Sequence, residues 1–138
     1  MDKDFDRWNK KKKIIDNRPN RVFCNEGEIW WCSFGINVGS EQNGGRNFFR
    51  PVAVIRVINY KTFFGIALTG RKIEDKDHFY LGVLGHSQSS AILPQVRLMD
   101  TKRLDGKICS LDAELFKKLK SALQWTLFGT VPLTSIEG

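Results

Sequence analysis

The sequence alternates between short apolar runs of strand length and clusters of turn-forming residues. Runs of this length, bounded by Gly, Asn, Asp or Pro, favour strands over helices. Five strands are therefore predicted: Glu28–Phe34, Val52–Ile58, Thr62–Thr69, His78–Leu84 and Ala91–Met99. Pro94 indicates a bulge or an edge position in the last of them, and the predicted turns are 43–45, 59–61, 74–77 and 85–90. About five short strands joined by tight turns predict a small barrel or two packed sheets.

The end of the chain has the periodicity of an amphipathic helix. Its apolar residues recur every three or four positions and form one face: Leu111, Leu115, Leu119, Ala122 and Leu123. Ser110 is the expected N-cap, and the charges of Asp112 and Glu114 complement the helix dipole in the first turn. Gly129 and then Pro132 are expected to end the helix.

Length and charge limit the classes of function. A chain of 138 residues and 15.8 kDa has the size of one domain, too short for a two-domain enzyme or a TIM barrel. Lys and Arg number 22 and Asp and Glu number 15, so the formal net charge is +7. A pI near 9.5 points to a polyanionic partner, most simply nucleic acid, although many small basic domains bind no polyanion.

Residues 1–21 differ from the rest and are interpreted as a basic N-terminal extension. They hold eight basic and four acidic side chains. Phe5 and Trp8 are three positions apart, and two isoleucines follow four consecutive lysines. This pattern predicts an amphipathic helix that ends between Asn17 and Pro19. The alternative is a solvated basic tail with two anchoring aromatic residues.

Cysteine usage and hydropathy indicate the compartment. Cys24, Cys32 and Cys109 are odd in number and widely spaced, which argues against a disulfide framework and against a zinc site. We therefore expect a reducing, cytoplasmic location. No apolar run approaches the ~20 residues of a membrane-spanning helix, and no signal peptide is expected at the N-terminus.

Most familiar catalytic patterns are missing from the sequence. It contains no P-loop, no G-x-G-x-x-G motif, no nucleophile elbow and no carboxylate cluster with metal-ligand spacing. A Ser/His/Asp triad stays open. The two histidines, His78 and His86, fall in predicted loop or strand-end positions. A two-histidine acid–base ribonuclease is conceivable, but two ordinary surface histidines are the favoured interpretation.

Residues 39–51 form a polar, Gly-rich and basic segment that leads into the strongest predicted strand. Glycine backbone amides can approach phosphates or bases closely. Arg46 and Arg50 have forked donors suited to phosphate, and Phe48 and Phe49 could stack on unpaired bases. From chemistry and position, the candidate RNA contacts here are Asn43, Arg46, Phe48 and Phe49. The alternative is a long hairpin loop with both phenylalanines packed on the core.

Structural roles are favoured in the polar segment 93–104. Arg97 and Asp100 are interpreted as a structural ion pair, and Arg103 as a side chain that covers the helix end.

An ordered set of short motifs in this sequence resembles the MazF/PemK family, the toxins of type II toxin–antitoxin systems. The matching motifs cover residues 27–128 and are Gly27-Glu28-Ile29-Trp30, Gly39-Ser40-Glu41-Gln42, Arg50-Pro51-Val52, Leu68-Thr69, Gln95-Val96-Arg97, Asp100, Arg103-Leu104 and the closing helix. The basic extension resembles one found in a branch of the family, so the chain divides into residues 1–21 and a toxin domain at 22–138.

The resemblance implies a fold and an activity. The fold would be mainly β, an SH3-like barrel with a C-terminal helix, here with an extra N-terminal helix and usually as a homodimer. The activity would be sequence-selective cleavage of single-stranded RNA without a metal or other cofactor, leaving a 2′,3′-cyclic phosphate and a 5′-hydroxyl. The protein partner would be an antitoxin with a flexible acidic tail, which suits a chain of charge +7.

The resemblance also implies site residues. Arg50 precedes the proline and would stabilise the phosphate and deliver a proton to the leaving oxygen. Since the pKa of arginine exceeds ~12, the electrostatic role is favoured. Thr69 ends a strand and would hydrogen-bond a phosphoryl oxygen, unless it only caps a turn. Glu41 would orient Arg50 or accept from a base, and Gln95 would read a base edge.

Two departures from the family pattern leave alternatives open. Asn47, Phe48 and Phe49 separate the Gly turn from Arg-Pro, so Arg46 competes with Arg50 as the catalytic arginine. Arg50 is favoured because Pro51 and the strand follow it. Pro94 precedes Gln95, which changes the backbone donors there. Rival functions are a gyrase poison on the same barrel and a binding barrel that holds RNA or a peptide without cutting it.

Overall fold

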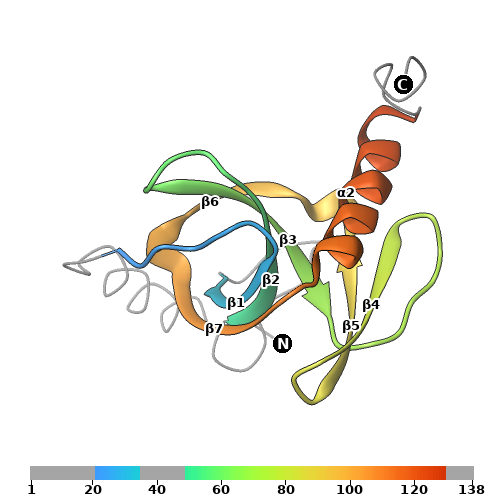
Figure 1. Ribbon diagram of the computed structural model, residues 1–138, viewed down its shortest axis with the longest axis horizontal. Coiled ribbons are helices and arrows are strands. Elements are labelled where there is room, and N and C mark those ends of the chain that lie inside the picture. Colours follow the sequence, from blue (N-terminus) through green and yellow to red (C-terminus); the bar gives the residue numbers. More distant parts are fainter. Residues whose placement is uncertain (1–20, 35–48, 130–138) are drawn as a thin grey trace, which may run out of the picture.

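The computed structural model describes residues 21–34 and 49–129, which form a curled antiparallel sheet with one helix against it (Figure 1). The elements are β1 (Glu28–Ser33), β2 (Phe49–Val57), β3 (Thr62–Thr69), β4 (His78–Leu84), β5 (Ser87–Ile92), η1 (Leu93–Gln95), β6 (Arg97–Asp100), η2 (Thr101–Arg103), β7 (Leu104–Ser110) and α2 (Ala113–Phe128). The predicted N-terminal helix lies outside the described residues.

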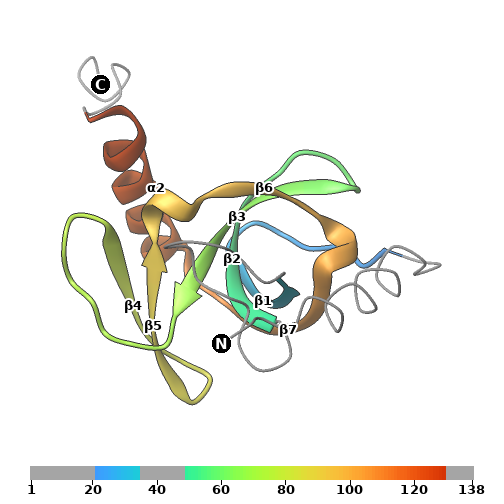
Figure 2. The same cartoon turned by 180° about the vertical axis from the view of Figure 1, so that it is seen from behind.

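Strand β3 organises the sheet because two different strands pair with one of its edges. The strand order is β4-β5-β3-β2-β1-β7, and β6 also pairs with β3. The first half of β3 pairs with β6, from Thr62↔Asp100 to Gly65↔Arg97, and its end pairs with β5 through Thr69↔Ser90. The strands β6, β3, β2, β1 and β7 therefore curl into a half-barrel, and β4 and β5 extend from its side (Figures 1 and 2).

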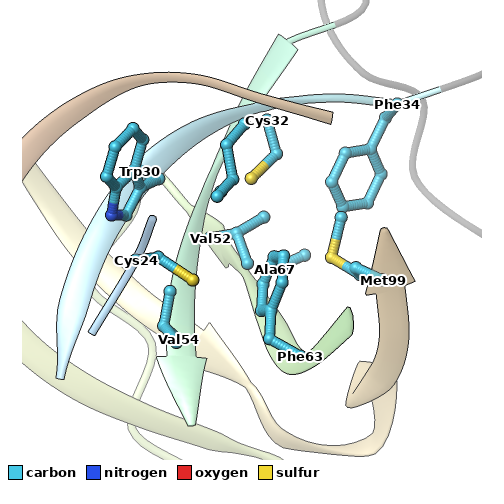
Figure 3. Close-up of a cluster of buried hydrophobic side chains, with 10 residues drawn as sticks. Cys24, Trp30, Cys32, Phe34, Val52, Val54, Phe63, Ala67 and Met99 are labelled. Atoms are coloured by element: carbon cyan, nitrogen blue, oxygen red, sulfur yellow. The ribbon is translucent and has the colours of Figure 1, made fainter. Parts of the chain in front are cut away.

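The concave side of the half-barrel holds one of two apolar cores (Figure 3). Its buried members are Cys24, Trp30, Cys32, Phe34, Val52, Val54, Phe63, Ala67, Met99 and Leu104. Packing is tight around Gly65, where a Cβ would come within 2.6 Å of Val52 Cγ1 and 2.9 Å of the Phe63 ring. Glycine at this position lets the strand pass close to its neighbours.

The other side of the same strands is buried in a second core, to which α2, β4, β5 and η1 contribute. Leu119 and Leu123 of the helix join Ile29, Ala53, Ile66 and Leu68 of the sheet in this core. Strands buried on both faces have continuous apolar sequences rather than alternating ones, which is why β1, β2 and β3 were predictable as compact runs. The apolar helical face predicted at the end of the chain is confirmed. No helix among residues 21–34 and 49–129 is long and apolar enough to cross a membrane.

The single strand predicted for Ala91–Met99 is wrong. The structure has β5 up to Ile92, a 3₁₀ turn at Leu93–Gln95, and then β6. Pro94 lacks the N–H that a ladder needs, and it lies in the first positions of the 3₁₀ turn. The turn allows the chain to leave one part of the β3 edge and rejoin it at another.

Two further boundaries differ from the prediction. The turn expected at 85–90 is shorter, because Ser87–Ser90 belong to β5, and Ser89 and Ser90 are buried. Strand β7 was not predicted, and Ser110 ends it rather than capping the helix. The N-cap is Asp112, whose carboxylate accepts from the Leu115 amide at 2.8 Å. Gly129 ends the helix, as predicted, and it has the left-handed conformation.

A buried carboxylate fixes the entry to β1. Glu28 is 7% exposed, and its Oε1 accepts from the Trp30 indole at 2.9 Å and the Asn25 amide at 2.7 Å. Lys107 of β7 lies 3.1 Å from Oε2. Burial alone would raise the pKa of Glu28, but these hydrogen bonds outweigh it and lower the pKa to about 2. The acidic residue of the Gly-Glu-Ile-Trp motif is therefore structural.

We expect Glu28→Gln to lower the free energy of unfolding by roughly 1–3 kcal/mol at pH 7, because it removes a charged partner from Lys107 and disturbs buried hydrogen bonds. A carboxyl with a lowered folded-state pKa stabilises the fold above its unfolded-state pKa of about 4.3. That stabilisation is lost as the pH falls toward about 2. The difference in free energy of unfolding between wild type and variant should therefore shrink over this pH range. Urea titrations followed by tryptophan fluorescence measure it.

Glu74→Gln is the matched control, because Glu74 makes an exposed ion pair with Lys72 and should change stability little. A constant gap between wild type and Glu28→Gln from pH 7 to pH 2.5 would contradict the assignment.

Candidate functional site

The candidate site lies at one end of the half-barrel, where β1 ends, β2 begins and β3 ends. In both views the start of β2 and the end of β3 lie along the same edge of the molecule (Figures 1 and 2). We call this end the mouth and define it by Phe34, Arg50, Thr69, Arg97 and Arg103. Contacts between neighbouring segments connect these residues.

Arg50 is held between the concave core and the end of β3. It is the second residue of β2 and pairs with Cys32 of β1. Strand alternation places its side chain on the same face as Val52, which belongs to the concave core. The guanidinium Nη2 donates to the Leu68 carbonyl oxygen at 2.8 Å. Partial burial lowers the pKa of Arg50 below its ordinary value, since a drier environment disfavours the charge.

Thr69 is the last residue of β3 and is 8% exposed. It shares a face with Ala67, another member of the concave core, and its backbone pairs with Ser90 of β5. Because Arg50 contacts the carbonyl of the preceding residue, the structure brings Arg50 and Thr69 together. The two predicted catalytic residues are 19 positions apart in the sequence and meet through antiparallel pairing of β2 and β3.

Gln95 lies on a different element from this pair, and its contact with RNA stays a prediction. Gln95 ends the 3₁₀ turn η1, which lies between the Leu68↔Ala91 and Gly65↔Arg97 pairs, and so falls beside the middle of β3. Phe49 begins β2, is half-buried and pairs with Ser33. The other predicted RNA contacts, Glu41, Asn43, Arg46 and Phe48, lie outside the described residues. The comparison of Arg46 with Arg50 therefore stays a prediction.

Two arginines that the sequence suggested as structural also reach the mouth. Arg97 stacks over the Phe34 ring with its guanidinium carbon 5.2 Å from the centroid, and Arg103 donates to the Ser33 carbonyl at 3.3 Å. Together with Arg50, which pairs with Cys32 and contacts Leu68, three arginines therefore contact residues at the ends of β1 and β3. Both residues lie in motifs that resemble the family, but neither is near Arg50 or Thr69 along the chain, so nothing in their spacing pointed to the site.

The ion pair predicted between Arg97 and Asp100 is wrong. Residues three apart on one strand point to opposite faces. The Asp100 carboxylate instead binds the guanidinium of Arg21 and accepts from the Lys102 amide at 2.8 Å. Arg103 likewise contacts β1 rather than the helix end.

The histidines cannot form an acid–base pair within one chain. His78 begins β4, where its Nδ1 lies 2.8 Å from the Asp75 carboxylate, and His86 follows the other end of that strand. Strand β4 has seven residues, so its two ends lie about 20 Å apart. His86 instead lines a cavity of about 250 Å³ with Trp31, Pro51 and Ile108. Among residues 21–34 and 49–129, no group of three His, Cys, Asp or Glu side chains could hold a metal ion.

Comparisons with known proteins agree on one family. The sequence pattern of the PemK-like, MazF-like toxins of type II toxin–antitoxin systems matches residues 25–127. Endoribonuclease EndoA of Bacillus subtilis is 30% identical over 116 residues, which cover 77% of this chain and 96% of that protein.

Solved structures share the fold at low sequence identity. MazF from Deinococcus radiodurans superimposes with a TM-score of 0.63 and 21% identity, covering 79% of this chain and 99% of that one. A mycobacterial endoribonuclease in complex with its cognate antitoxin has a TM-score of 0.60 and 11% identity, covering 80% of this chain and 100% of that one.

Proposed function

The chain belongs to the family of PemK-like, MazF-like toxins of type II toxin–antitoxin systems, and we propose that it is an endoribonuclease that cleaves single-stranded RNA at selected sequences without a metal. The observation that carries the proposal is the contact of Arg50 with the end of β3, which puts a partly buried guanidinium beside Thr69. The relationship to EndoA, an endoribonuclease by name, supports the same reaction class.

The proposed reaction is an internal transesterification. The ribose 2′-oxygen attacks the adjacent phosphorus in line and loses its proton to a base, and the new P–O2′ bond closes a 2′,3′-cyclic phosphate. The P–O5′ bond breaks, and the leaving 5′-oxygen takes up a proton to give a 5′-hydroxyl. The enzyme must therefore stabilise negative charge on the phosphoryl oxygens and assist both proton transfers.

Arg50 suits the charge-stabilising role. Its guanidinium presents several donors in a plane, the geometry that matches phosphate oxygens. The contact with Leu68 orients it before substrate arrives, and a preorganised donor stabilises developing charge without reorganising during the reaction. The lowered pKa of Arg50 also makes donation of a proton to the leaving oxygen less unfavourable, although electrostatic stabilisation remains its main role.

Thr69 would donate a hydrogen bond from its hydroxyl group to a phosphoryl oxygen. Its backbone is fixed by pairing with β5, and its side chain shares the concave face with Arg50. Arg97 and Arg103 add positive charge at the mouth, which would attract the RNA backbone. Glu41, Asn43, Arg46, Phe48, Phe49 and Gln95 remain proposed RNA contacts.

We propose an acidic antitoxin as the protein partner and a homodimer as the assembly. Structures of MazE–MazF from Deinococcus radiodurans and of the mycobacterial endoribonuclease with its antitoxin support the first. The net charge of +7 suits an acidic chain. Exposed apolar side chains at the end of α2, Trp125 and Phe128, are suited to a second copy. The cytoplasm is the proposed location.

We expect Arg50→Ala to lower the cleavage rate by about 10²–10³-fold, because it removes a preorganised electrostatic stabiliser. The measurement is incubation of the purified protein with a long single-stranded RNA in EDTA, followed by mapping of the new ends. Discrete cuts with 5′-hydroxyl ends are expected for the wild type.

The matched control is Arg56→Ala, which removes an exposed arginine from the same strand and should cut at the wild-type rate. Full activity in Arg50→Ala would overturn the assignment and transfer it to Arg46. RNA binding by the wild type without any cut would favour the non-cleaving barrel, and trapped DNA breaks instead of RNA ends would favour a gyrase poison.

Deleting residues 1–20 should weaken RNA binding and make it less sensitive to salt, because this segment carries seven of the 22 basic side chains and phosphate contacts release counterions. The deletion keeps Arg21 and its contact with Asp100. Titration of a labelled RNA at several salt concentrations measures the slope. An unchanged slope would assign the extension to the antitoxin or to assembly.

A further inference from the structure

Ser90 connects the catalytic end of β3 to the loop that follows it. Its backbone pairs with Thr69, and its side chain is fully buried. The hydroxyl oxygen accepts from the Ile73 amide at 3.0 Å, and the hydroxyl donates to the Arg71 carbonyl at 2.7 Å. One side chain therefore satisfies two backbone groups on either side of Lys72 and fixes the path of the chain directly beyond Thr69.

This hydrogen bonding holds Arg71 close to the site. Two residues of extended chain span at most about 7 Å, so the Cα atoms of Thr69 and Arg71 lie within that distance. Gly70 lies between them, and among the residues that the structure describes no atom is within 4 Å of the position a Cβ would take, so none of these residues blocks a ligand from the backbone here. Arg71 is exposed, and in the part of the chain that the structure describes its guanidinium makes no ion pair with a carboxylate.

Lys72, the next residue, is arranged differently. Its ammonium lies 3.4 Å from the Glu74 carboxylate and 5.0 Å from the centroid of the Tyr80 ring. These contacts hold it along the β4 side and partly neutralise its charge. Of the two adjacent cations, Arg71 is the one available to an anion beside Thr69.

We propose that Arg71 binds a phosphate that neighbours the scissile phosphate, and that Ser90 positions it. The proposal rests on the proposed function. A guanidinium can donate two parallel hydrogen bonds to a phosphodiester, and the RNA backbone presents such a group one linkage away on each side of the cut. Arg71 contributes to substrate binding rather than to the chemical step, because Arg50 and Thr69 occupy the scissile position.

The test uses a short oligoribonucleotide with one mapped cleavage site, in natural form and with a neutral methylphosphonate at each neighbouring linkage in turn. Arg71→Ala should raise KM for the natural substrate by about 10-fold, the effect of losing one charge-assisted hydrogen bond, with kcat within about two-fold. One methylphosphonate substrate should raise KM for the wild type by a similar factor and raise it no further in Arg71→Ala. Lys76→Ala removes an exposed cation from the same loop and should leave KM unchanged.

Ser90→Ala should raise KM in the same way and should add little in the Arg71→Ala background, because residues that act through one contact are not additive. It should also speed hydrogen exchange of the Ile73 amide. Ser89→Ala is the matched control, since Ser89 is also buried and its hydroxyl donates to Ser87 within the same strand, at 3.3 Å. Neither effect is expected there.

The outcomes separate the two levels of the proposal. If the wild type makes no cut, both the proposed function and this inference fail. If the wild type cuts and Arg71→Ala has the wild-type KM, only the role of Arg71 is wrong. The same conclusion follows if the increase in KM from the variant multiplies with the increase from every neutral linkage. If Ser90→Ala does not fold, the cycle between Arg71 and the methylphosphonates still decides the main claim.

Discussion

The hydrogen-bonding edges of β3 are the constraint on which the rest of the structure depends. One edge is occupied by β2 and the other is divided between β6 and β5. Because β5 and β6 pair with different parts of this edge, the chain must leave β3 between them. The 3₁₀ turn η1 connects β5 to β6 there. The same pairing closes the half-barrel on one side and extends it into β4 and β5 on the other. Thr69 lies at the end of the strand, in the part of the edge that pairs with β5.

This arrangement explains why the site is at the mouth. In the middle of β3, both faces are covered by apolar cores, and a charged side chain there would be costly to bury. At the end of the strand, the concave core stops, and Arg50 can keep part of its surface in water while its guanidinium contacts the Leu68 carbonyl. The core thus provides a rigid and partly dry support for groups that must stay charged or polar.

Much of the fold could be predicted from the sequence, and the reasons differ by element. Strands β3 and β4 were predicted with their observed bounds, and β1 and β2 to within a few residues. Burial on both faces gives β1, β2 and β3 continuous apolar runs, whereas β4, which is mostly only partly buried, was recognisable from the turn-forming residues on either side of it. Strand β5 was missed because its serines are typical of turns, although Ser90 satisfies backbone groups of a neighbouring loop. Strand β7 was missed because Asp105, Gly106 and Lys107 interrupt any apolar pattern.

The site was predictable only in part. Spacing alone gave no reason to pair Arg50 with Thr69, and that pairing came from the resemblance to a family. The structure supplies the physical link, an antiparallel register that brings the two strand ends together. Arg97 and Arg103 were not placed there, because their contacts with Phe34 and Ser33 depend on closure of the barrel. Arg71 had no motif at all, and its position follows from a buried hydroxyl in another strand.

The three cysteine thiols differ in burial, so their reactivities report how often the interior of the barrel opens. Cys24 and Cys32 lie in the concave core, where burial raises the pKa of Cys24 to about 11 and raises the pKa of Cys32 as well. Cys109 packs against the core beneath α2 and is half-buried. Because the thiolate is the reactive form, an alkylating reagent would label the first two only when the barrel interior is exposed. Cys109 is already partly exposed in the folded protein, so its labelling needs no opening of the barrel. The delay between labelling of Cys109 and labelling of Cys24 and Cys32 would therefore report how rarely the barrel interior opens.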